Sequence, residues 1–581
     1  MADMNSTSKY ETPIVRHPKT PREMLKDPLA TNCEVNNTHV FQVKRETVAI
    51  IFVPGIMGSR LANQKNEPTW DPDKSKFMFT TYYKAAPKKR YKLLISQDQP
   101  LKVATLANEE HKKYPKAEQR GWPGVSWAFY GELLRKLHDW NTSLKVLLDL
   151  PVYAFGYDWL QSNRDTAKKL QEVIQRIPAQ KVILVTHSMG GLVARYALGG
   201  EGGAAISDKV LGVIHGAQPV HGAPAAYRRQ VAGHEVSGFF NILGMIGAKV
   251  LGEDGPSVTA IFPHARSALQ LLPSQHYRTN DGRSAWLHIQ TPGKPEEYVS
   301  YPQNGDPYTE IYLKSHHRDY WGMIHGEWFQ PAPEDGATID RALSHEEAQA
   351  EEEPGPLNTA KIIRRNLDYA RDFHGKIGHF CHPRTMQLFS NGEQTTCTEV
   401  SWHARDITEL VKKRPDPTYE RVNKFQYFAL EHIDGINNWS KGNYSEVRWG
   451  NKDGTLGDVV TGDTRFEALD RGIAMDKCLF QIWMTRFGNS GPGMASEDIC
   501  HLGDGTVPLS SATGLTPSIE QWGNCVHMLP TWNSPNGAES KMTTGQANTQ
   551  EHSKFFDSKA IEATLNTIHN LCLAWLKDEL T

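Results

Sequence analysis

The sequence lacks most features that mark a specialised class of protein. Its seven cysteines in 581 residues are odd in number and lack the spacing of a zinc site or a disulfide framework. A formal net charge of −2 gives no basic excess, so we expect no nucleic acid partner. No apolar run reaches the roughly 20 residues of a transmembrane helix, and no internal repeat indicates a solenoid. What remains, 39% hydrophobic and 22% charged residues, is typical of a globular protein.

The N-terminus also lacks an apolar segment. It begins MADMNSTSKYETPIVRHPKTPRE, whereas a secretory signal peptide needs an apolar core of about 7–15 residues. We therefore expect synthesis in the cytoplasm without a signal peptide. Residues 1–45 are expected to form a polar tail.

Short apolar runs alternate with helical patterns over the first third of the chain. The runs at 47–53, 150–159 and 209–217 have the length of buried strands, and amphipathic patterns near 128–137 and 164–177 separate them. This alternation predicts an α/β fold with a mostly parallel central sheet.

Long stretches without that alternation predict insertions into the core. The expected organisation is a first core part at 46–224 with an insertion at 63–120, a lid or cap insertion at 225–383, a core strand at 384–403, a second insertion at 404–498 and a last core part at 499–581.

The segment THSMG (186–190) predicts a nucleophile at Ser188. Four branched apolar residues precede it and an apolar helical pattern follows. A strand that turns into a helix at a serine is the context of the G-x-S-x-G nucleophile elbow, although Thr186 stands in place of the first glycine. A serine that only caps a helix is the alternative interpretation.

A serine nucleophile needs a histidine base and a carboxylate that orients it, which follow the serine in the order acid, then histidine. Asp504, in LGDGTVP, suits the acid, although a plain Asp-Gly turn is the alternative. Three histidines follow it: His569 lies within an expected terminal helix, and His527 alternates like a strand residue. His552, in TQEHSKFF, lies on a polar loop, so we favour it over His527 as the base.

The reaction also requires N–H donors for the charge that develops on the substrate carbonyl oxygen. The amide of Met189, directly after the serine, is one candidate. The loop PGIMG (54–58) follows the first strand, and its glycines allow close approach of the backbone. We assign the second donor to Ile56, with Met57 as the next candidate.

The segment VSGFFNILGMIGAKVL (236–251) carries more apolar residues than one core-facing stripe requires. It is too short to cross a bilayer. A buried helix and a lid that opens at a lipid surface are both consistent with it. The residues expected to contact lipid in the second case are Phe239, Phe240, Ile242, Leu243, Met245 and Ile246.

Several histidine-rich segments suggest metal binding but lack its signatures. FHGKIGHFCH (373–382) and the group His316, His317 and His325 do not have the spacing of zinc ligands. NKDGTLGD (451–458) lacks the spaced carboxylates of a calcium loop. We expect no cofactor and no catalytic metal, while a structural ion stays open.

Five stretches together resemble the lecithin:cholesterol acyltransferase-like branch of the α/β-hydrolases. They are VPGIMGSRL (53–61), YDW (157–159), THSMGGLVARY (186–196), ALQLLPS (268–274) and GDGTVP (503–508), in the order of that family. The resemblance implies an α/β-hydrolase fold with large lid or cap insertions. It places the family's nucleophile on Ser188, its acid on Asp504, its base on His552 and its oxyanion loop on residues 55–57.

The large insertions and polar N-terminus resemble the antibacterial lipase effectors that bacteria export by type VI secretion. This resemblance implies a serine lipase or phospholipase that acts on membrane phospholipid in the periplasm of a target cell. Its expected partners are an immunity protein and a spike component of the secretion apparatus. A lipid acyltransferase or esterase of the same fold, and a non-catalytic binding protein that retains the fold, are the alternatives.

Overall fold

The structure is a computed structural model of the 581-residue chain. It describes residues 8–11, 14–16, 23–25, 37–40, 45–233, 252, 255–330, 359–390, 398–406, 447–451, 477–484, 503–515, 526–527, 552 and 555–580, with short gaps at 84, 96–99, 107, 292–293, 295, 316–318 and 320. The segment 236–251, expected to form a lid or a buried helix, therefore lies outside the described residues.

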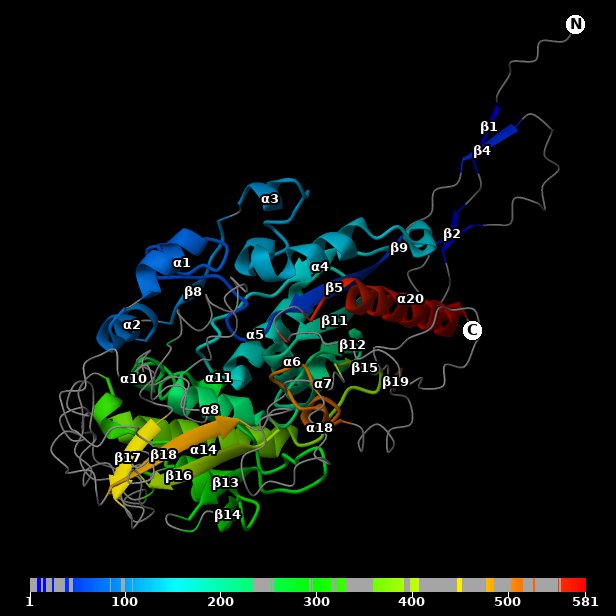
Figure 1. Cartoon of the computed structure of the whole chain (residues 1–581). Coiled ribbons are helices and arrows are strands. Elements are labelled where there is room, and N and C mark those ends of the chain that lie inside the picture. The colour runs from blue at the N-terminus through cyan, green and yellow to red at the C-terminus, as the bar shows by residue number, and fades with distance from the viewer. Residues whose placement is uncertain are drawn as a thin grey trace, which may run out of the picture.

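A parallel sheet of seven strands forms the centre of the molecule (Figure 1). Its strands are β5 (Glu46–Val53), β9 (Leu148–Asp149), β10 (Val152–Ala154), β11 (Lys181–His187), β12 (Val210–Gly216), β15 (Thr385–Leu388) and β19 (Val526–His527). The order across the sheet is β10-β5-β11-β12-β15-β19, with β9 beside β5, and every pairing is parallel. The predicted α/β fold with a mostly parallel central sheet is confirmed.

Helices cover both faces of this sheet, which explains why its strands are apolar without interruption. Ile50 of β5 packs in the cluster that contains residues of α4 (Trp127–Asp139) and α20 (Ser558–Leu580). Ile51 packs on the opposite face with residues of α5 (Asn163–Arg176) and α6 (Met189–Gly199). Both side chains are fully buried, so alternate residues of one strand serve two separate cores.

A second sheet of five strands unites segments that are far apart in the sequence. Its strands are β13 (Leu287–Gln290), β14 (Tyr298–Tyr301), β16 (Val400–Asp406), β17 (Val447–Asn451) and β18 (Lys477–Met484), in the order β14-β13-β16-β18-β17. Only β13 and β16 pair in parallel. Thus β13, from the first expected insertion after the elbow, and β18, from the last one, both pair with β16. Residues of α8 (Pro224–Ala232) and α14 (Thr359–Ile377) pack with residues of β13 and β16 in one apolar cluster.

The remaining elements are short. The stretch 63–120 contributes α1 (Ser75–Tyr82), α2 (Pro87–Leu94), α3 (Glu109–Lys112) and, with residues 61–62, a small antiparallel sheet of β6 (Leu61–Ala62), β7 (Pro68–Trp70) and β8 (Lys102–Val103). In the expected tail, β1 (Ser8–Glu11) pairs with β4 (Asn37–Val40), and β2 (Ile14–Arg16) pairs with β3 (Glu23–Leu25). Further α-helices among the described residues are α7 (Ala204–Ser207), α10 (Gly255–Thr259), α11 (Arg266–Leu269) and α18 (Leu509–Ala512).

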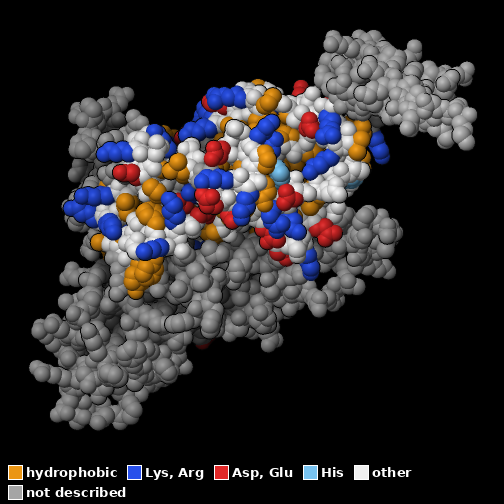
Figure 2. Space-filling view, turned by 90° about the horizontal axis from the view of Figure 1, so that it is seen from above, with side chains coloured by type: hydrophobic (Ala, Val, Ile, Leu, Met, Phe, Trp, Pro, Cys, Tyr) orange, Lys and Arg blue, Asp and Glu red, His pale blue; other side chains and the backbone are white. Residues whose placement is uncertain are grey.

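Among the described residues, none of the helices combines the length and the apolar character that crossing a membrane would require. Figure 2 shows Lys and Arg side chains lying among Asp and Glu side chains on the described part of the face it presents. This mixture agrees with the small net charge of the chain.

Candidate active site

Ser188 occupies a strained turn between β11 and α6. Its φ angle is +51° and its ψ angle is −125°, a sparsely populated conformation that costs a non-glycine residue roughly 1–3 kcal/mol. The turn is tight because α6 begins against the end of β5: a Cβ on Gly190 would lie 2.4 Å from the carbonyl oxygen of Val53 and 2.5 Å from that of Pro54. Only glycine fits there, so the last glycine of the motif holds Ser188 at the carboxyl edge of the sheet.

Thr186, the departure from the glycine motif, lies in β11 directly opposite His215 of β12. Its hydroxyl forms a hydrogen bond of 2.8 Å with Nδ1 of that histidine, and both side chains are buried. Burial lowers the pKa of His215 to about 3, so the ring is neutral near pH 7. A threonine at this position therefore satisfies a buried polar neighbour.

The structure brings Ser188, Asp504 and His552 into one hydrogen-bonded chain. His552 Nε2 lies 2.8 Å from Ser188 Oγ, and His552 Nδ1 lies 2.6 Å from Asp504 Oδ2. The other carboxylate oxygen of Asp504 accepts hydrogen bonds from the backbone N–H groups of Thr506 and Val507, at 3.0 and 2.7 Å. A carboxylate accepts, so Nδ1 of the imidazole carries the proton and Nε2 is left to accept from the serine hydroxyl.

The two other histidines that follow Asp504 occupy other elements. His527 lies in β19, whose backbone pairs with β15. His569 lies in α20, where its Nδ1 is 3.4 Å from the Thr142 hydroxyl.

The loop that carries the expected oxyanion donor Ile56 is fixed by three aromatic side chains. Tyr157 donates a hydrogen bond of 2.8 Å to the carbonyl of Pro54, and Trp70 donates one of 3.0 Å to the carbonyl of Met57. The hydroxyl of Tyr130 accepts from the N–H of Gly55 at 3.2 Å. Apart from hydrogen bonds within helices and between strands, no backbone carbonyl among the described residues accepts from the N–H of Ile56 or from that of Met189.

His187, directly before Ser188, connects this loop to His552. Its Nε2 lies 3.0 Å from the backbone carbonyl of His552, and its Nδ1 lies 2.9 Å from the Tyr130 hydroxyl. Because a carbonyl only accepts, Nε2 carries the proton and Nδ1 accepts from Tyr130. The hydrogen bonds from Gly55 to Tyr130 and then to His187 therefore run in one direction. Burial lowers the pKa of His187 to about 3, which keeps this ring neutral.

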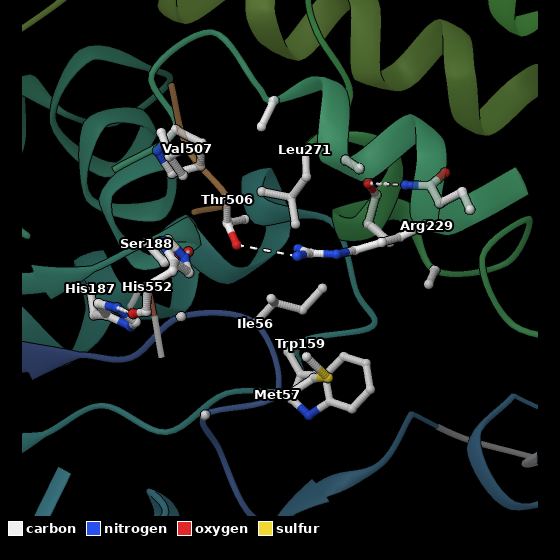
Figure 3. Close-up of a pocket in the computed structure, with 18 of the residues that line it drawn as sticks. Ile56, Met57, Trp159, His187, Ser188, Arg229, Leu271, Thr506, Val507 and His552 are labelled. Atoms are coloured by element: carbon white, nitrogen blue, oxygen red, sulfur yellow. Dashed lines mark hydrogen bonds between the residues drawn. The ribbon is translucent and has the colours of Figure 1, made fainter. Parts of the chain in front are cut away.

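A cavity of about 250 Å³ opens beside these groups (Figure 3). Its lining is mostly apolar and comes from the loop at 55–58, from α8, from the segment 258–271 and from the loop that carries Asp504. The polar side chains among its described lining residues are those of Tyr130, Trp159, His187, Ser188, Arg229, Gln230, Thr506 and His552. An apolar cavity that ends at a serine hydroxyl suits an acyl chain whose carbonyl lies at Ser188.

No group of three or more His, Cys, Asp or Glu side chains among the described residues is arranged to hold a metal ion. Within the segment 373–382, His374 Nε2 lies 2.8 Å from the carbonyl of Gln270, and His379 Nδ1 lies 3.4 Å from the carbonyl of Gly514. His316, His317 and the stretch 452–458 lie outside the described residues.

Tyr130, His187, Tyr157 and Trp70 have no predicted role, yet their side chains form the hydrogen bonds that fix the loop at 54–57 and His552. Two of them, His187 and Tyr157, lie in segments that the sequence already marks as motifs, THSMG and YDW. Tyr130 has no such signal, because its buried position on α4 resembles that of any core residue. Its hydroxyl contact becomes apparent only in three dimensions.

The family comparison can now be set beside this geometry. The lecithin:cholesterol acyltransferase family model matches residues 131–293. This range contains three of the five resembling stretches, at 157–159, 186–196 and 268–274. The predicted resemblance to that family is therefore confirmed over this part of the chain.

A chain of the Tle4–Tli4 complex shares this fold at low sequence identity. It aligns with 91% of this chain and 99% of its own length, at 22% identity and a TM-score of 0.58. Weaker matches are Aspergillus fumigatus lipase B (13% identity, TM-score 0.16, 30% of this chain and 25% of that chain) and phospholipase PlaB from Legionella pneumophila (9%, 0.20, 88% and 100%). Among curated proteins, none matches the chain by sequence.

Proposed function

We propose that this protein is a serine hydrolase that cleaves acyl esters of phospholipids through an acyl-enzyme on Ser188. The observation that carries the proposal is the hydrogen-bonded chain from Ser188 Oγ through the His552 ring to Asp504. A serine hydroxyl is a weak nucleophile unless a base removes its proton, and this arrangement supplies the base and the anion that orients it.

The reaction then proceeds in two halves. His552 Nε2 takes the proton of Ser188 as Oγ attacks the ester carbonyl, and the N–H groups of Ile56 and Met189 stabilise the negative oxygen. The protonated imidazole gives its proton to the leaving alcohol, and the acyl group stays on the serine. In the second half, His552 activates a water molecule that releases the fatty acid.

The direct test compares fatty acid release from phospholipid vesicles by the wild type and by Ser188→Ala. We expect the variant to lose activity at least about 10³-fold, because the nucleophile and base act as one unit. Circular dichroism and the melting temperature of the variant serve as controls for folding. Undiminished release by a folded Ser188→Ala protein would disprove the mechanism and favour a binding protein that retains the fold.

Acyl transfer is a second candidate, because the matching family model is that of an acyltransferase. The same acyl-enzyme would then be resolved by a lipid alcohol instead of water. Product analysis with and without an added long-chain alcohol separates the two reactions. Hydrolysis predicts free fatty acid in both, whereas transfer predicts a new ester when the alcohol is present.

We further propose that the enzyme is an antibacterial effector, made in a bacterial cytoplasm and delivered to the periplasm of a target cell. The fold shared with a chain crystallised in a two-protein complex supports an immunity protein as a partner. Periplasmic expression in a cell without that partner should be toxic, while cytoplasmic expression should be tolerated. Harmless periplasmic expression of an active enzyme would contradict this role.

A further inference from the structure

A guanidinium group enters the otherwise apolar cavity from α8. Ala223, directly before α8, and Ala226 and Arg229, within it, line the cavity at intervals of three residues. This spacing places the three side chains on one face of the helix. Two small side chains leave space, and the third is long and charged. Figure 3 shows Arg229 extending from α8 toward Thr506, between Ile56 and Leu271.

Arg229 contacts the same loop that holds the acid. Its Nη2 lies 3.3 Å from the hydroxyl of Thr506, and the backbone N–H of Thr506 donates to Asp504 Oδ1. The guanidinium therefore lies in the same cavity as Ser188, close to the Ser188–His552–Asp504 chain but not part of it. Among the described residues that line the cavity, Arg229 is the one side chain with a permanent charge.

An acyl chain alone gives no reason for a cation in this position. In a glycerophospholipid, however, the phosphate is only a few covalent bonds away from the scissile ester, so a substrate whose ester lies at Ser188 places its phosphate close to the same site. Arginine binds phosphate through two parallel hydrogen bonds, and an apolar surrounding strengthens such a charged contact relative to water.

We infer that Arg229, supported by Thr506, binds the phosphate of the lipid substrate and so determines specificity for phospholipids over neutral acylglycerols. This inference rests on the proposed function. Arg229 would contact the phosphate both in the bound phospholipid and in the transition state of its cleavage. A neutral ester has no phosphate and would contact only the apolar part of the cavity.

The test compares two substrates that share their acyl chains, dihexanoylphosphatidylglycerol and dihexanoylglycerol, both below the concentration at which they aggregate. Monomers avoid any general attraction of the protein to a charged lipid surface. The variants are Arg229→Gln and Arg229→Lys. Arg176→Gln is the matched control, because it makes the same charge change at an exposed ion pair with Glu172 on α5.

We expect Arg229→Gln to lower kcat/KM on the phospholipid about 10- to 100-fold, the loss typical of a charge-assisted hydrogen bond. Its kcat/KM on dihexanoylglycerol should fall far less than on the phospholipid, and the activity of Arg176→Gln on both substrates should stay unchanged. Arg229→Lys should have an intermediate kcat/KM on the phospholipid, since lysine keeps the positive charge but cannot form two parallel hydrogen bonds to the phosphate. Equal losses on both substrates would show that Arg229 only supports the acid loop, and no loss on either would show that it does not contact the phosphate. Either result overturns the inference.

A binding measurement decides the inference without turnover. Calorimetric titration of Ser188→Ala with dihexanoylphosphatidylglycerol should give an affinity that falls about 10-fold or more when Arg229→Gln is added. Inorganic phosphate should not displace the lipid, and Arg229-dependent phosphate binding as tight as that of the lipid would make this a free-anion site instead. If the wild type cleaves neither substrate, the proposed function fails, and the titration still tests the phosphate contact.

Discussion

At the residue scale, the two oxygens of Asp504 are held by different partners. Oδ1 accepts from two backbone N–H groups, and Oδ2 faces Nδ1 of His552. In Asp504→Asn the backbone N–H groups would keep the amide oxygen on their side, so the NH₂ group would face His552. That donor forces the imidazole into the tautomer that cannot accept from Ser188. We expect kcat to fall about 10³- to 10⁴-fold with an unchanged melting temperature. Asp208→Asn, the same change on the surface, is the control. A loss below tenfold would mean that Asp504 does not orient the base.

His187 and Tyr130 make a second prediction at this scale, because they link His552 to the loop that carries Ile56. In His187→Gln the amide nitrogen can still donate to the His552 carbonyl, while the contact with Tyr130 is lost. In His187→Asn the shorter side chain can still accept from Tyr130, while the contact with His552 is lost. We expect each variant, and Tyr130→Phe, to lower kcat roughly 10- to 100-fold with little change in KM, because small displacements of reacting groups are costly.

A double-mutant cycle separates this connection from mere packing. Tyr130→Phe should have a smaller effect in the His187→Gln background, where only its contact with Gly55 is left to lose, than in the His187→Asn background, where both of its contacts are present. Additive effects in both backgrounds would contradict a connected chain of hydrogen bonds.

At the scale of elements, the contact between α6 and β5 positions Ser188, the proposed nucleophile. A Cβ at position 190 would collide with backbone atoms of residues 53 and 54, which cannot move without displacing the loop that follows. We expect Gly190→Ala to cost about 1–3 kcal/mol of unfolding free energy and to lower kcat more than tenfold. Gly375→Ala on α14 is the matched control, since its nearest neighbour would be 3.8 Å away and alanine favours a helix by up to about 1 kcal/mol. An active, stable Gly190→Ala protein would refute this account of the elbow.

The elements also show which parts of the structure the sequence could predict. The apolar runs at 47–53 and 209–217 identify strands because both of their faces are buried, and the elbow, the acid and the favoured histidine follow from local motifs joined by a known chain order. The second sheet could not be predicted, because its strands are far apart in the sequence. More than a hundred residues separate β13 from β16, and several tens separate β16 from β18. Their pairing depends on long-range packing, and their short lengths give weak periodicity. The contacts of Tyr130 and Arg229 are equally non-local.

At the scale of the whole molecule, buried neutral histidines make stability depend on pH. Burial lowers the pKa of His187 and His215 to about 3 and that of His374 to about 4, whereas an unfolded chain binds these protons near pH 6.5. Between these values the unfolded state holds more protons, so stability is lost as the pH falls below about 6.5. Each histidine then costs about 1.4 kcal/mol per pH unit, or roughly 6 kcal/mol for the three at pH 5.

Urea unfolding between pH 7 and pH 5 measures this loss. His374→Gln keeps a donor for the carbonyl of Gln270 but does not titrate, so its stability should fall less steeply by about 1.4 kcal/mol per pH unit. Identical slopes in the variant and the wild type would contradict the assignment of a buried, neutral His374.

The central claim is that Ser188 is the activated nucleophile, and covalent trapping tests it most directly. A fluorophosphonate reacts far faster with a serine whose proton an adjacent base removes than with an ordinary serine. Intact mass and peptide mapping of the full chain should show one adduct, on the peptide that contains Ser188, with none in Ser188→Ala and much slower labelling in His552→Ala. An adduct on another residue, or equal labelling of the Ser188→Ala protein, would contradict the account.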